Sequence, residues 1–159
     1  MKSASTDFPI PMGGLMNPPP KGTTKSSIPV RGRDVCPEFL PFICLLESYK
    51  TKFKNLHWAA INHPQHVVVG DFLADLDDFQ DELAETGQGI LGQFSSNDIT
   101  TEHINCNDPL DAVDELKKSI LTFHACINTM PELIGLVNSV EGFMTTVGKY
   151  IYLLKLAKK

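Results

Sequence analysis

Long apolar runs are missing from this chain of 159 residues. No stretch of about 18 or more apolar residues occurs, so the sequence predicts no membrane-spanning helix. The N-terminus also lacks the apolar core of a secretory signal peptide. We therefore expect a protein of the cytoplasm, or of the inside of a virus particle, that is not secreted and has no membrane partner.

The spacing of the four cysteines fits no common disulfide or metal-binding framework. Cys36, Cys44, Cys106 and Cys126 form neither a CxxC pair nor a zinc-finger pattern, and a disulfide framework is not expected in a helical domain of this size. Cys44 and Cys126 lie in apolar helical segments, so we expect them to be reduced core residues. Glycine-rich phosphate loops, nucleophile elbows and zinc-protease motifs are absent as well, so the sequence indicates none of those enzyme classes.

The chain divides into two unlike parts, an arm over residues 1–35 and a body over residues 36–159. The arm is rich in Pro, Gly, Ser and Thr, a composition that predicts a flexible, extended segment. Five cations against one carboxylate give residues 1–33 a formal charge of +4. Because the whole chain has a formal charge of −5, the remaining residues carry a charge of −9. Four of these cations are Lys21, Lys25, Arg31 and Arg33. Such an arm can bind nucleic-acid phosphates, lie along a neighbouring subunit or a viral capsid protein, or remain a solvated tail.

Four apolar stripes at helical spacing predict four helices in the body. The first spans about residues 37–60, with Pro37 in its first turn, and the second spans residues 64–91, with Gly87 and Gly89 fraying its end. The third begins at Asp108-Pro109, a cap followed by a first-turn proline, and Met130-Pro131 separates it from the fourth. The stripes are Phe39, Phe42, Leu46, Tyr49, Phe53 and Leu56; Val69, Phe72, Leu76, Phe79 and Leu83; Val113, Leu116, Ile120, Phe123 and Ile127; and Leu133, Val137, Val140, Met144, Val147, Ile151 and Leu154. Short, long and short connections predict an all-α, ferritin-like four-helix bundle, the class with one long connection.

Two histidines and two carboxylates make a candidate transition-metal site. His57 and His66 flank the turn between the first two helices, and Asp81 and Glu85 lie further along the second. At about 1.5 Å per residue, His66 and Asp81 are roughly 22 Å apart along the helix. One chain cannot bring these ligands to one ion. We therefore expect a homo-oligomer in which two copies of helix 64–91 pack antiparallel.

One face of the second helix carries the residues that this pairing needs. His66, Gly70, Ala74, Asp77, Asp81 and Glu85 lie opposite the apolar stripe at about 100° per residue. The small residues Gly70 and Ala74 near the middle would let two helices approach closely at an interface. In the register that pairs His66 with Asp81, Gly70 faces Asp77. The alternative is that this acidic face is simply solvated.

The other histidines have no evident ligand role in the sequence. His63 lies in the turn before Pro64 and is expected to be exposed. Neither His103 in the long connection nor His124 in the third helix has an evident partner. Glu141 in the fourth helix is either an internal ligand or a solvated side chain.

The pattern Leu56-His57-Trp58, then His66, then Asp81-x-x-x-Glu85, resembles Dps, the mini-ferritin family of starvation proteins. The resemblance implies that His57 and His66 bind iron between antiparallel helices together with Asp81 and Glu85 of the partner subunit. It also implies that Trp58 can carry an electron away from the site, whereas the alternative role of Trp58 is a partly buried aromatic at the turn. The family has a further Asp where this chain has Gly70, and Asp77 is the residue that could partly replace that carboxylate.

A closer resemblance is to an uncharacterised Dps-like family found mostly in phages and large viruses. Its pattern is matched here by His57, His66, Phe72, Asp81, Glu85 and Gln88-Gly89. The likeness covers residues 45–90, the last two helices match only as an apolar pattern, and the arm does not match. It implies that the protein is encoded by a virus or phage.

Three functions remain open from the sequence. The first is an oligomeric Dps-like protein that binds iron or another divalent transition metal and, if the site is intact, oxidises it as a ferroxidase; iron(II) accepts imidazole and carboxylate ligands together. The second is a structural or capsid-associated protein of a virus particle, without a cofactor, in which the bundle is a scaffold and the arm a tether. The third is a nucleic-acid compaction protein that uses the cations of the arm.

Overall fold

The computed structural model describes residues 35–158, and the regular elements of that part of the chain are all helical. They are α1 (Phe39–Trp58), α2 (His63–Leu91), the 3₁₀ turn η1 (Ser96–Asp98), α3 (Pro109–Ile127), the 3₁₀ turn η2 (Pro131–Leu133) and α4 (Ile134–Ala157). The four predicted helices are therefore confirmed, each within about one turn of its expected bounds. The predicted arm spans residues 1–35, and its residues 1–34, which include the cations Lys21, Lys25, Arg31 and Arg33, lie outside the described residues.

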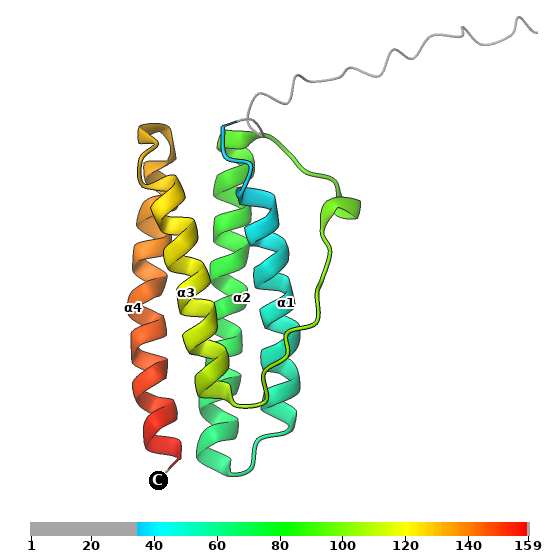
Figure 1. The fold of residues 1–159 in the computed structure, drawn as a ribbon, viewed down its shortest axis with the longest axis vertical. Coiled ribbons are helices and arrows are strands. Elements are labelled where there is room, and N and C mark those ends of the chain that lie inside the picture. The colour runs from blue at the N-terminus through cyan, green and yellow to red at the C-terminus, as the bar shows by residue number, and fades with distance from the viewer. Residues whose placement is uncertain (1–34, 159) are drawn as a thin grey trace, which may run out of the picture.

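The four helices form a bundle of two antiparallel hairpins, α1 with α2 and α3 with α4 (Figure 1). Contacts between α2 and α4, and between α1 and α3, join the hairpins into one body. Residues 92–108 run the length of the bundle, so α3 begins at the end where α2 began (Figure 1).

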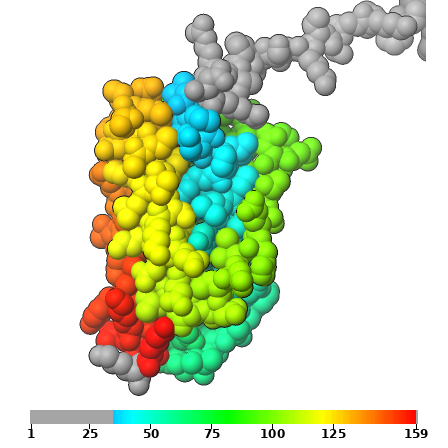
Figure 2. Space-filling view, viewed as in Figure 1, coloured from blue at the N-terminus to red at the C-terminus, as the bar shows by residue number. Residues whose placement is uncertain are grey.

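The long connection lies against α1, as the space-filling view also shows (Figure 2). The backbone N–H of Glu102 donates to the Ser48 hydroxyl at 2.9 Å. The Ser48 hydroxyl in turn donates to the Cys44 carbonyl at 2.9 Å, and the Thr100 N–H lies 3.4 Å from the Cys44 sulfur. These contacts hold an otherwise irregular segment in place on one side of the bundle.

The core consists of the predicted apolar stripes with one change of face in α4. The stripes of α1, α2 and α3 are all buried. Aromatic rings link the helices, since Phe42 and Phe123 stack with centroids 4.1 Å apart and Phe79 and Phe143 stack at 4.0 Å. In α4 the prediction was partly wrong, because Met144 and Ile151 are only half-buried, whereas the core takes Leu136, Phe143 and Tyr150. Met144 and Ile151 each follow another apolar residue, Phe143 or Tyr150. The packing of α4 against α2 and α3 therefore decides which member of each pair faces the core.

The predicted helix ends are right at Asp108 and wrong at two other places. The Asp108 side chain caps α3 by accepting from the N–H groups of Leu110 and Asp111. Pro37, expected in the first turn, precedes α1 instead. Gly87, expected to fray α2, is buried within it, because the Phe39 ring packs so closely that a Cβ there would lie 2.0 Å from Phe39 Cζ. The helix continues to Leu91 and ends at Gly92, whose φ of +93° suits glycine.

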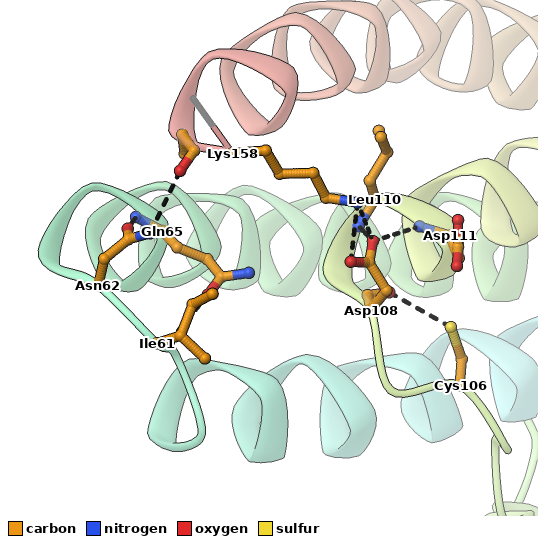
Figure 3. Close-up of polar contacts among 9 residues, drawn as sticks. Ile61, Asn62, Gln65, Cys106, Asp108, Leu110, Asp111 and Lys158 are labelled. Carbon is orange, nitrogen blue, oxygen red and sulfur yellow. Dashed lines mark hydrogen bonds and ion pairs between the residues drawn. The ribbon is translucent and has the colours of Figure 1, made fainter.

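Polar contacts close the end of the bundle where α2 and α3 begin and α4 finishes (Figure 3). The Asn62 side chain caps α2 by accepting from the Gln65 N–H at 2.8 Å, and its amide donates to the Ala157 carbonyl at 3.2 Å. Lys158 and Asp108 form an ion pair at 2.8 Å that ties the end of α4 to the start of α3. None of the described helices is long and apolar enough to cross a membrane.

Candidate metal centre

His57 and His66 lie side by side where α1 ends and α2 begins. Their rings stack with 3.8 Å between centroids and 29° between planes. The Nδ1 atom of His57 is 3.0 Å from the His66 carbonyl oxygen, and the Nδ1 atom of His66 is 3.0 Å from the His57 carbonyl oxygen. The two residues therefore bond reciprocally across the hairpin, with His57 half-buried and His66 exposed.

These two hydrogen bonds decide which ring nitrogens stay free. A carbonyl oxygen only accepts, so each Nδ1 carries the hydrogen that it donates. In the neutral imidazole, Nε2 then keeps its lone pair. A backbone carbonyl that accepts from the non-coordinating nitrogen is a common partner of metal-binding histidines. The pair thus presents two Nε2 atoms in the form that coordinates a metal.

Gly70 lies directly beside the His57 ring. A Cβ at this position would be 2.9 Å from His57 Cε1 and 3.0 Å from His57 Nδ1, which is closer than real Cβ contacts. A side chain at position 70 and the stacked histidine pair therefore compete for the same space. This competition gives a physical reason for glycine at the position where the family resemblance implies an aspartate.

Asp81 and Glu85 are exposed on α2, on the face that also carries His66, Gly70 and Ala74. Because α2 is one continuous helix from His63 to Leu91, Asp81 stays roughly 22 Å from His66. Within the described residues, Asp81 and Glu85 form no three-ligand group with the histidines. The four predicted ligands do not meet within one chain, as helix geometry requires.

Asp77, the expected replacement for the missing carboxylate, is paired within its own chain. It forms an ion pair with Lys50 of α1, and Lys50 also lies 3.3 Å from Glu47. Burial alone would lower the pKa of Lys50, but the two carboxylates outweigh burial and the pKa is raised. A role for Asp77 as a ligand would require this ion pair to open.

The small residues of the predicted interface face a groove between α1 and α2. Its volume is about 450 Å³. Gly70, Leu73, Ala74 and Asp77 line it from α2, and Glu47, Lys50, Thr51 and Lys54 line it from α1. The face that the sequence predicts for helix pairing is therefore accessible and hollowed along its middle.

Trp58 is exposed, which contradicts the interpretation of a partly buried aromatic. Its exposed fraction is 68%, and its ring contacts the Lys54 ammonium, 5.4 Å from the ring centroid. Trp58 is the last residue of α1. A large exposed aromatic next to His57 suits a surface that a second molecule covers.

The remaining histidines divide into exposed and paired ones. His63 is exposed, as expected, and so is His103. His124, for which the sequence offered no partner, bonds through Nε2 to Glu141 Oε1 at 3.0 Å. Glu141 is exposed, as the solvated interpretation expects, and the packing of α3 against α4 also brings it to His124.

The sequence did not predict a second group of candidate metal ligands, which the structure brings together. Cys36, Glu38 and Cys126 have ligand atoms that all lie within 4.8 Å of one another. The expectation that Cys44 and Cys126 are core residues was wrong, since both are only half-buried while Cys36 and Cys106 are buried. Burial, then the charges of Cys126 and Glu38, raises the pKa of the Cys36 thiol to about 11. The sequence shows only Cys36-x-Glu38 before the first helix, and this pattern does not indicate a metal site by itself. The site becomes evident only when the structure places Cys126, in the last turn of α3, beside these two residues.

Comparison of the chain with protein-family models, with curated proteins and with solved structures finds no match.

Proposed function

We propose that this chain is a ferritin-like, Dps-like protein that assembles through α2 and binds a divalent transition metal between subunits. His57 and His66 would supply two imidazoles, and the partner subunit's Asp81 and Glu85 two carboxylates. The observation that carries the proposal is the reciprocal hydrogen bonding of the two histidines, which leaves both Nε2 atoms unprotonated in the neutral state.

The architecture supports this proposal independently of the ligands. Bundles of two hairpins joined by one connection that runs their length are typical of ferritin-like proteins, and residues 92–108 are such a connection. The α2 face that would pair with a second copy is exposed or half-exposed from His66 to Glu85. The small, exposed Ala74 near the middle of this face allows the close approach that an antiparallel pair needs.

The proposed ligand set suits the charge of the metal. Two neutral imidazoles with two carboxylates neutralise a divalent ion, and iron(II) accepts both ligand types. Bound iron would supply the redox chemistry, while the protein would orient the imidazoles through the carbonyl oxygens of His57 and His66. The His57 ring fills the space beside Gly70, so this chain has no carboxylate at the position where the Dps family has a further Asp. We therefore propose metal binding as the primary activity and iron oxidation as a property to be measured.

An anaerobic titration with iron(II), followed by peroxide, tests the proposal. Bound metal per chain and molar mass are measured for the full chain and for an Asp81→Ala/Glu85→Ala variant. We expect binding and oligomerisation in the full chain and loss of binding, but not of assembly, in the variant. Asp71→Ala with Glu82→Ala is the matched control, because it removes the same charges from the same helix outside the predicted face.

The other two functions predict different outcomes of this experiment. An assembly that binds no iron would contradict the proposal and favour a virion scaffold. Deletion of residues 1–33 would then abolish incorporation into particles. Binding to DNA that falls steeply with salt and disappears with the same deletion would favour nucleic-acid compaction.

A further inference from the structure

Three potential ligands meet at the end of the bundle opposite the histidine pair. Cys36 precedes α1, Glu38 occupies the N-cap position of α1, and Cys126 lies in the last turn of α3. Their ligand atoms lie within 4.8 Å of one another, and Cys126 Sγ is 3.3 Å from Glu38 Oε2. The length of α1, roughly 28 Å, separates this group from His57, so the two groups cannot share an ion.

The spacing of the group is close to that of a tetrahedral metal site. Zinc binds thiolate sulfur at about 2.3 Å and carboxylate oxygen at about 2.0–2.2 Å, which places tetrahedral ligands roughly 3.5–3.8 Å apart. A contraction of about 1 Å at most would therefore bring all three ligands to one ion. Glu38 is exposed and Cys126 is only half-buried, so this contraction does not require the core to move.

The surroundings of the group also suit a cation. In the structure, the Cys126 thiol points its proton at the Glu38 carboxylate, so one proton already holds these two groups together. A divalent ion would displace the protons of both thiols and would offset two of the three negative charges of the thiolates and the carboxylate, which otherwise repel one another. Cys36 is 2% exposed, so a bound ion would be shielded from water on one side and open on the Glu38 side.

We propose that Cys36, Cys126 and Glu38 bind a thiophilic divalent cation of the zinc class, with a fourth position open to solvent. Two thiolates select zinc over iron(II), magnesium or calcium, so this site would be chemically distinct from the histidine pair. The ion would join the residues that lead into α1 to the last turn of α3. It would thereby hold Cys36 and the start of α1 against the end of α3.

Cobalt(II) is the probe that tests this site, because its absorption reports both its ligands and its geometry. The full chain is titrated with cobalt in the presence of a phosphine reductant. We expect one thiolate-bound cobalt ion per chain, with thiolate-to-cobalt charge-transfer bands and the intense visible bands of a four-coordinate site, and we expect zinc to displace it. Cys126→Ser should remove about half of the charge-transfer intensity. Glu38→Gln, at an exposed position, should keep the fold and weaken cobalt binding at least about tenfold.

Two controls separate this site from the rest of the molecule. Cys44→Ser changes a half-buried cysteine outside the group and should leave the cobalt spectrum unchanged. His57→Ala with His66→Ala should leave the thiolate-to-cobalt charge-transfer bands unchanged, so loss of metal binding at the histidine pair can be told apart from loss of metal binding at the cysteines. Absence of charge-transfer bands in the full chain, or their survival in a Cys36→Ser/Cys126→Ser variant, would overturn the proposal. A Cys36–Cys126 disulfide found without reductant, together with no cobalt spectrum from the reduced chain, would identify a covalent link instead.

Discussion

The imidazole of His57 occupies the space that a side chain at Gly70 would need, with the glycine's potential Cβ 2.9 Å from His57 Cε1. The close packing of His57, in the last turn of α1, against α2 thus requires glycine at position 70. The stacking and reciprocal hydrogen bonds of His57 with His66 follow from this close approach.

Gly70→Ala should therefore weaken metal binding without improving stability. In an open helical position this change gains up to about 1 kcal/mol, but here the Cβ must displace the His57 ring. We expect the gain to vanish and iron(II) affinity to fall by about tenfold or more, as measured by denaturant unfolding and metal titration. Gly148→Ala is the control, because nothing lies within 4 Å of its Cβ position. Equal stabilisation by both changes would contradict the observed His57 position.

Gly87→Ala and Gly89→Ala should have opposite effects on stability. A Cβ at Gly87 would lie 2.0 Å from Phe39 Cζ and 2.4 Å from Phe39 Cε2, whereas nothing lies within 4 Å at Gly89. Overpacking of this kind costs about 1–3 kcal/mol, while a helical Gly→Ala change in open space gains about 0.5–1 kcal/mol. Urea unfolding of both variants measures the difference. A stable Gly87→Ala protein would mean that Phe39 packs elsewhere.

Asp108→Ala should destabilise the protein at neutral pH by about 1 kcal/mol through loss of the α3 cap. Burial would raise the pKa of Asp108, but hydrogen bonds from Lys158 and from the Asp111 and Leu110 amides outweigh burial and lower it. A lowered pKa means that the carboxylate stabilises the fold above its unfolded pKa, about 3.9, and that this contribution is lost as the pH falls through the folded value. The difference from wild type should therefore shrink below about pH 4. Unfolding curves at neutral and acidic pH test this, with Asp111→Ala as the control.

Tyr150 should make the protein sensitive to alkali. Its hydroxyl donates to Asp75 Oδ2 at 2.8 Å, and burial, then Asp75 and Asp71, raises its pKa. Because the raised pKa favours the neutral form in the fold, its contribution is present below the unfolded pKa of about 10 and is lost as the pH rises above it. Tyr150→Phe should lose about 1 kcal/mol at neutral pH and show less alkaline destabilisation. The same slope in both proteins would rule out Tyr150 as the source, and Tyr152→Phe, at a 62% exposed position, is the control.

Particular residues show where sequence reasoning succeeded. Phe53, Leu76 and Ile120 are fully buried because their periodicity alone assigns them to the inward face of a helix. Asp108-Pro109 marked the start of α3 because a cap and a first-turn proline act locally. Met144 and Phe143 show where it failed, since two adjacent apolar positions leave the inward face undecided until the neighbouring helices are in place.

The sequence by itself determined four amphipathic helices, one long connection and the placement of His57 and His66 on either side of a tight turn, because periodicity, caps and chain length act within a few residues. Only the tertiary structure decided that Phe39 packs on Gly87, that His124 meets Glu141, and that Cys36, Glu38 and Cys126 form one group. The first two contacts depend on the register of the two helices within each hairpin, and the third exists only because the two hairpins dock against each other.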